Sequence, residues 1–171
     1  MSSLRNWVEC PGPRVPELLA DKIRFVANFP ITDDEAMQFS IVLEKIVEEL
    51  EVDNLSPVDF SRVTVIFTEN GGFEFEDEGD NVALGLHFSL AVYAIGRIRE
   101  KVAIQGEIVA FITFIEELVH HFWRLEDEVE TKIKVTNIVN RIFERNFYIT
   151  DLFSREWLND ELRRQGNQPR F

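Results

Sequence analysis

Two carboxylates and two imidazoles lie close together in the stretch FITFIEELVHHFW, residues 111–123 of the chain. On a helix, residues four apart share a face, so Glu116 pairs with His120 and Glu117 pairs with His121. Two ligands at that spacing can hold one cation, and a neighbouring carboxylate can take a proton from a water molecule bound to the cation. The types and spacing of these residues therefore predict a metal site that activates water.

The same stretch also fits a structural role. Its apolar residues share one face of the predicted helix, while the acidic and imidazole side chains lie together on the opposite face, as they do on any amphipathic surface helix. Glu and His four residues apart also stabilise a helix modestly, by about 0.2–0.5 kcal/mol when the His is charged. Because a catalytic cleft and a solvated surface give the same pattern, both interpretations stay open.

The segment EELVHHF resembles the His-Glu-x-x-His helix of zincin-like metallopeptidases. The resemblance covers residues 35–144, in which a helix, strands, an active-site helix and an acidic helix follow one another as in the minimal core of that family. Glu116 stands where the family has its first histidine, so the motif is a degenerate Glu-Glu-x-x-His. The resemblance implies that Glu117 is the general base and that His120 is a metal ligand. It places the downstream acidic ligand within residues 125–130, with Glu128 first by spacing and Glu130 next.

This resemblance implies zinc, or another divalent cation such as manganese, as the cofactor, and a peptide as the substrate. An anionic Glu116 in place of a neutral imidazole lowers the net charge of the site and weakens its polarisation of bound water. The chain is thus expected to be a metal-dependent hydrolase or a catalytically impaired relative. His121 is the alternative to His120 as the imidazole ligand.

A different class of function follows from the charge of the chain. Its 171 residues carry a formal net charge of −13, which disfavours ordinary binding to nucleic acid. Acidic residues are dense in the ranges 74–80 and 126–130. These stretches favour a non-enzymatic interaction protein that binds a basic partner or mimics the charge of nucleic acid.

Three observations predict a cytoplasmic protein that does not cross a membrane. Cys10 is the single cysteine and cannot form an internal disulfide. The first thirty residues lack a basic segment followed by an apolar run. The richest apolar stretch, residues 108–115, falls well short of the roughly 20 residues that span a bilayer.

The remaining candidate residues favour structural roles. His87, the third histidine, lacks a Glu three residues before it, so the second Glu-x-x-His pair needed by di-iron four-helix proteins is missing. We expect it to be a half-exposed residue of a strand. Phe153 and Trp157 could form a homodimer contact through the last helix, although packing on the core is the simpler interpretation.

We expect an irregular arm over residues 1–16, a single domain over 17–165 and a frayed tail over 166–171. Prolines and glycine interrupt the arm. A short helix is predicted from about Glu17 to Ala27. A capping box formed by Thr32 and Glu35 then begins a longer amphipathic helix.

Alternating residues predict strands in the middle of the chain. Val63 to Phe67 and Phe73 to Phe75 alternate around Asn70-Gly71, the strongest short signal for a hairpin. Alternation continues from Val82 to Val92 and predicts a third strand, followed by a basic turn over residues 97–101. Further helices are expected at 107–124 and 127–145, with a last one capped by Thr150 or Ser154. The predicted fold is therefore α+β and rich in helix, with a small, mostly antiparallel three-stranded sheet and helices packed on one face.

Overall fold

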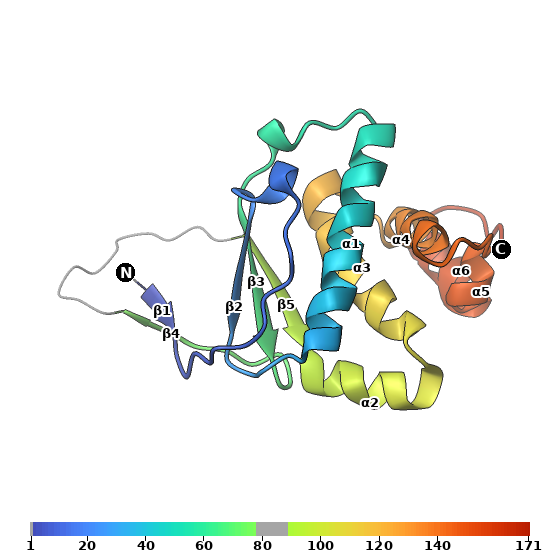
Figure 1. Cartoon of the computed structure of the whole chain (residues 1–171). Coiled ribbons are helices and arrows are strands. Elements are labelled where there is room, and N and C mark those ends of the chain that lie inside the picture. Colours follow the sequence, from blue (N-terminus) through green and yellow to red (C-terminus); the bar gives the residue numbers. More distant parts are fainter. Residues whose placement is uncertain (1, 78–88) are drawn as a thin grey trace.

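The structure is a computed structural model that describes residues 2–77 and 89–171 (Figure 1). The strands are β1 (Ser2–Leu4), β2 (Ile23–Ala27), β3 (Val63–Thr68), β4 (Phe75–Asp77) and β5 (Ser89–Ala94). The helices are α1 (Asp33–Val52), α2 (Ile95–Gln105), α3 (Ile108–Trp123), α4 (Glu128–Phe143), α5 (Ile149–Leu152) and α6 (Arg155–Arg164), with short 3-10 turns at Glu17–Leu19 and Pro57–Asp59. The fold is α+β, and Figure 1 shows α1 and α3 together on one face of the main sheet.

The main sheet has the strand order β2-β3-β5, and its strands are parallel. Val65 of β3 lies between Phe25 of β2 and Ala91 of β5. The prediction of a mostly antiparallel sheet was therefore wrong. Parallel neighbours need a long crossover connection, and α1 provides it between β2 and β3.

The predicted hairpin at Asn70-Gly71 was also wrong, although a turn does form there. The backbone N–H of Gly71 donates to Thr68 Oγ1 at 2.8 Å, and Gly71 has a φ of 98°, which a glycine adopts without strain. β2 and β5 occupy both sides of β3, so the turn leads the chain away from the sheet instead of back along it. The next strand, β4, pairs antiparallel with β1 in a separate two-stranded sheet.

β2 lies where a helix was predicted. Within residues 17–27 only the 3-10 turn at Glu17–Leu19 is helical, and the chain then extends as β2. Ile23 and Ala27, four residues apart, are both buried, which fits one face of a strand as well as one face of a helix. The pairing of β2 with β3 decided between the two.

The longer helices confirm the predictions made for them. The side chain of Thr32 accepts from the backbone of Glu35 and the Glu35 carboxylate accepts from the backbone of Thr32, as a capping box requires. α3 and α4 match the helices predicted at 107–124 and 127–145, and Ser154 caps α6. The predicted basic turn at 97–101 was wrong, because these residues lie within α2. The third strand is observed only as β5, and residues 82–88 lie outside the described part of the chain.

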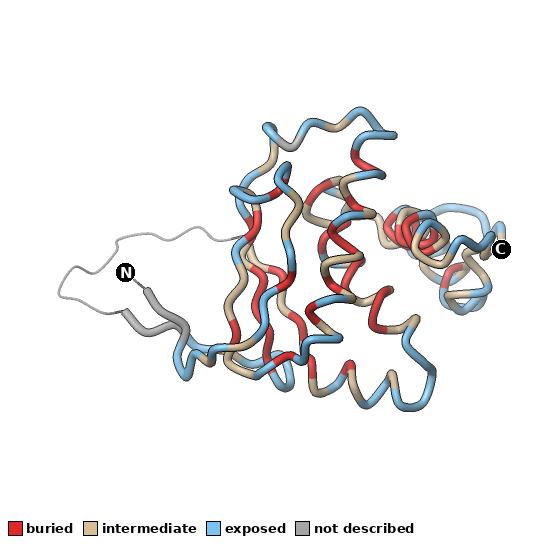
Figure 2. Tube along the Cα trace, viewed as in Figure 1, coloured by how far each residue is buried: buried red, intermediate tan, exposed pale blue. Residues whose placement is uncertain are grey.

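Aromatic side chains join the sheet to the helices that cover it. Phe39 of α1 contacts Phe67, Tyr93 and Phe114, with ring centroids 5.6, 5.3 and 4.9 Å away. The hydroxyl of Tyr93 donates to the carbonyl of Phe114 at 2.9 Å, which fixes α3 against β5. Figure 2 shows the buried residues concentrated between the sheet and these helices. α3 is therefore packed against both β5 and α1.

The two ends of the described chain make specific contacts. β1 lies within the expected irregular arm, and the N–H of Val8 donates to the carbonyl of Ala27 at the edge of β2. At the other end, the side-chain carbonyl of Asn159 accepts from the backbone N–H groups of Arg170 and Phe171, each at 3.1 Å. None of the described helices is both long and apolar enough to cross a membrane.

Candidate metal centre

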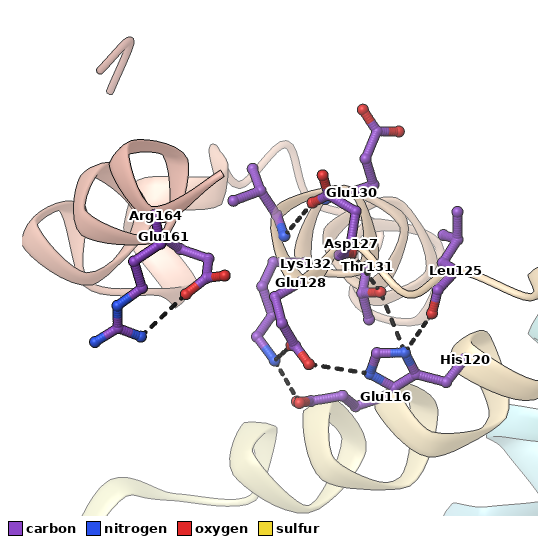
Figure 3. Close-up of polar contacts among 11 residues, drawn as sticks. Glu116, His120, Leu125, Asp127, Glu128, Glu130, Thr131, Lys132, Glu161 and Arg164 are labelled. Carbon is purple, nitrogen blue, oxygen red and sulfur yellow. Dashed lines mark hydrogen bonds and ion pairs between the residues drawn. The ribbon is translucent and has the colours of Figure 1, made fainter. Parts of the chain in front are cut away.

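The candidate site lies where α3 ends and α4 begins (Figure 3). α3 stops at Trp123 because Arg124 adopts a left-handed conformation with a φ of 52°. Asp127 then caps α4 by accepting from the backbone N–H groups of Val129 and Glu130 at 2.8 and 3.0 Å. This tight connection sets the last two turns of α3 against the first two turns of α4.

Three of the predicted residues converge at this junction. Glu116 and His120 extend from α3 and Glu128 extends from α4, and one ligand atom from each lies within 4.8 Å of the others. His120 Nε2 is 3.7 Å from Glu128 Oε1. All three side chains are half-buried. The structure thus brings together the three residues that the sequence named as metal ligands.

The ring of His120 is oriented in the way that metal-binding histidines usually are. Its Nδ1 lies 2.7 Å from the carbonyl oxygen of Leu125. A carbonyl can only accept, so Nδ1 carries the proton and the lone pair of the neutral ring is on Nε2, the atom that faces Glu128. Such a hydrogen bond to a backbone carbonyl fixes the tautomer and the orientation of a ligating imidazole.

Lys132 is the residue of this site that the sequence analysis missed. Its Nζ donates to Glu116 Oε1 and is 3.4 Å from Glu128 Oε2, so one ammonium joins two of the three candidate ligands (Figure 3). The side chain is only 9% exposed. The spacing offered a signal, since Glu128 and Lys132 are four residues apart on α4 and form a common helical ion pair.

Two aromatic rings lie beside the Lys132 ammonium. Its Nζ is 5.5 Å from the ring centroid of Phe153 and 5.4 Å from that of Trp157. Both distances are within the range of cation–π attraction. Phe153 is half-buried against the core, whereas Trp157 is 36% exposed, and the homodimer contact stays a prediction.

Glu117, the predicted general base, borders the triad but is not part of it. The residue is exposed overall. Even so, partial desolvation of its carboxyl raises its pKa above the ordinary value for glutamate. Interaction with His120 and with the ammonium of Lys132 opposes this shift, whereas the negative charges of Glu116 and Glu128 add to it. Glu117 is therefore electrostatically connected with the site.

His121 has a different environment from His120, its neighbour in the sequence. Its Nδ1 is 2.9 Å from Ser89 Oγ and its Nε2 is 3.1 Å from the carbonyl oxygen of Ser61. Nε2 must donate to that carbonyl, so Nδ1 accepts from the serine hydroxyl. Desolvation lowers the pKa of His121 below the ordinary value for histidine. With both ring nitrogens engaged, His121 links α3 to β5 and to the loop before β3.

The other candidates do not join the triad. Glu130, the second choice for the downstream acid, is exposed on α4, and the triad contains Glu128 instead. Cys10 is a half-buried free thiol in the arm. His87 and residues 78–80 of the acidic stretch lie outside the described part of the chain.

No protein family, curated protein or solved structure matches this sequence. The geometry of the junction between α3 and α4 is therefore the basis on which a function is proposed.

Proposed function

We propose that the protein binds a divalent transition-metal cation, zinc or manganese, through Glu116, His120 and Glu128. The observation that carries this proposal is the convergence of these three ligand atoms within 4.8 Å of one another. The orientation of His120 supports it, because Nδ1 is engaged by the carbonyl of Leu125 and Nε2 faces the carboxylate of Glu128.

The donor set suits such a cation. Zinc binds imidazole nitrogen and carboxylate oxygen at about 2.0–2.2 Å, so ligand atoms around a tetrahedral ion are roughly 3.3 Å apart. Coordination at this spacing requires the half-buried Glu116 and Glu128 side chains to rotate, because the three ligand atoms are separated by up to 4.8 Å in the structure. Three protein ligands leave a fourth position for water, as in catalytic rather than structural zinc sites.

We further propose that the protein is a catalytically impaired relative of metal-dependent hydrolases. A zinc ion at this position would polarise a bound water molecule, and Glu117 follows Glu116 on α3 as the candidate base. Two features argue for weak catalysis. The ligand set contains two anions, which reduce the polarisation of water, and the ammonium of Lys132 competes for the same carboxylates.

Titration calorimetry of carefully stripped protein with zinc and with manganese tests the proposal. We expect near-stoichiometric binding and a rise in melting temperature on adding the cation. His120→Ala and Glu128→Gln should each weaken binding by more than about tenfold, since losing even an outer partner of a metal ligand costs 10–100-fold. Glu130→Gln, which removes an exposed carboxylate from the same helix, is the matched control and should bind as the wild type does.

Two results would contradict the proposal: the absence of heat and of thermal stabilisation with both cations, or equal binding by the three variants and the wild type. The proposal of impaired catalysis is tested separately. The zinc-loaded wild type should cleave peptides no faster than the zinc-loaded Glu117→Gln variant does. A clear loss of cleavage in that variant would show an active hydrolase instead.

The alternative, an acidic surface for a basic partner, has less support from the described residues. Of the acidic stretch 126–130, Asp127 caps α4 and Glu128 is paired with Lys132, which leaves Glu126 and Glu130 exposed. Binding through such exposed charges would weaken steeply with salt. Capture of a partner that persists at high salt would exclude this alternative.

A further inference from the structure

Lys132 and a cation bound at the triad require the same two carboxylates, those of Glu116 and Glu128. The ammonium contacts Glu116 Oε1 and Glu128 Oε2, and these two carboxylates supply two of the three candidate ligands. Two positive charges cannot share that position without strong repulsion in a half-buried site. The cation can therefore bind only when the Lys132 ammonium has moved away from these carboxylates.

We infer that Lys132 is the specificity-determining residue of the site, an internal cation that an incoming metal ion must displace. This inference rests on the proposed cation site. The ammonium compensates the charge of Glu116 and Glu128 when no metal is bound, so a metal ion binds only if its bonds are stronger than these ion pairs.

Competition of this kind selects among cations. Magnesium and calcium prefer oxygen ligands in sets of six or more, and they gain little from an imidazole. Zinc and the later transition metals bind imidazole strongly, so they can displace the lysine more readily. The expected ligand is therefore a transition-metal cation that binds nitrogen, and magnesium and calcium are excluded.

Displacement of the ammonium also reaches the C-terminal helices. Phe153 ends α5 and Trp157 lies in the first turn of α6, and both rings lie within 5.5 Å of Lys132 Nζ. These cation–π contacts are lost when the ammonium leaves. The environment of Trp157 must then change, whereas Trp123 contacts a different lysine, Lys134, and keeps its neighbours.

The first test compares Lys132→Met with Lys134→Met. Lys134 is a close match, since it lies on the same helix, pairs with two carboxylates at 3.0 and 2.6 Å and is 5.4 Å from a tryptophan ring. We expect Lys132→Met to bind zinc at least about tenfold more tightly than the wild type, and to acquire measurable binding of magnesium. Lys134→Met should bind zinc with the affinity of the wild type. Equal affinities in Lys132→Met and Lys134→Met would overturn the inference while leaving the cation site itself in place.

The second test uses the intact chain and does not depend on the folding of a lysine variant. Zinc should change the tryptophan fluorescence of the wild type, and Trp157→Phe should abolish most of that change while still binding zinc in calorimetry. An undiminished change in Trp157→Phe would overturn the inference.

If Lys132→Met does not fold in the first test, as judged by circular dichroism, Lys132→Gln replaces it. If a Lys132 variant binds zinc and the wild type does not, the result would support the inference while contradicting the function proposed for the wild type. Failure of every form to bind zinc would overturn both proposals.

Discussion

At the scale of single residues, His120 and His121 show why the function of a helix face depends on its neighbours. They are adjacent on α3 and therefore point in directions about 100° apart. His120 faces α4 and the carboxylate of Glu128, while His121 faces Ser89 and the carbonyl of Ser61. The sequence named both as possible ligands, and only the packing of α3 separates their roles.

Spacing on a helix placed Glu116 and His120 on one face, and the resemblance to zincin-like metallopeptidases suggested Glu128. The sequence analysis missed Lys132 because a lysine on an acidic helix is usually a solvated partner of its neighbours. Its burial depends on the approach of α3 and on the rings of Phe153 and Trp157, which are contacts between elements distant in sequence.

His121 leads to a prediction about stability and pH. Its pKa is lowered in the folded state, so the unfolded chain takes up a proton at a higher pH than the folded chain does. The neutral ring of His121 therefore contributes its full stabilisation of the folded state above the pKa of this histidine in the unfolded chain, about 6.5. This contribution is lost as the pH falls below that value. Urea unfolding of metal-free protein at several pH values should show a smaller decrease over this window in His121→Gln than in the wild type. An identical decrease in both would contradict the structural role of His121.

At the scale of elements, the parallel sheet follows from the unit formed by β2, α1 and β3. Alternation correctly placed β3, and the capping box correctly placed the start of α1. Strand direction was predicted wrongly because Asn70-Gly71 is a strong local signal for reversal, whereas the partners of β3 are residues 23–27 and 89–94, far away in the sequence. Local patterns thus fixed the type of several elements but not their pairing.

α4 is held between two helices by lysines that point to opposite sides. Lys132 pairs with Glu116 of α3, and Lys134 pairs with Glu49 of α1. Glu49 is almost fully buried, with only 4% of its side chain exposed, and also accepts from Arg141 at 2.7 Å. Ion pairs on both of its faces therefore join α4 to its neighbours.

We expect Glu49→Ala to destabilise the protein by about 1–3 kcal/mol, because it removes the buried acceptor of Arg141 and one of the two carboxylates that pair with Lys134. The neighbouring Glu48→Ala is the control. Glu48 is exposed, and within the described part of the chain its ion pair is with Lys45 of the same helix, so its loss should change stability by about 0.5 kcal/mol or less. Chemical denaturation of both variants gives the comparison, and equal losses would contradict a structural role for the buried network.

Gly96 provides a second prediction at this scale. Its N–H donates to the carbonyl of Glu69 at 3.0 Å, where the start of α2 meets the end of β3. A Cβ at this position would lie 2.7 Å from that carbonyl oxygen, so Gly96→Ala should destabilise the protein by about 1–3 kcal/mol. Gly12→Ala, with nothing within 4 Å of the added atom, should have little effect. Thermal melts that rank the two variants equally would contradict this packing.

At the scale of the whole molecule, the net charge of −13 does not describe the environment of each carboxylate. Glu35, Glu49 and Glu116 are each held by a cation from another element, and these pairs join α1 to α2, α1 to α4 and α3 to α4. Composition predicted an acidic surface, but it could not show that part of this charge stabilises contacts between helices. The candidate site is one such contact, with an imidazole added.

The central claim is that a metal ion binds between α3 and α4. Anomalous diffraction from crystals grown with zinc, recorded on both sides of the zinc absorption edge, tests it most directly. We predict one strong anomalous peak within coordinating distance of Glu116, His120 and Glu128, with the ammonium of Lys132 moved away from both carboxylates. The claim would be contradicted if crystals grown with excess zinc showed no anomalous peak there and Lys132 still contacted Glu116.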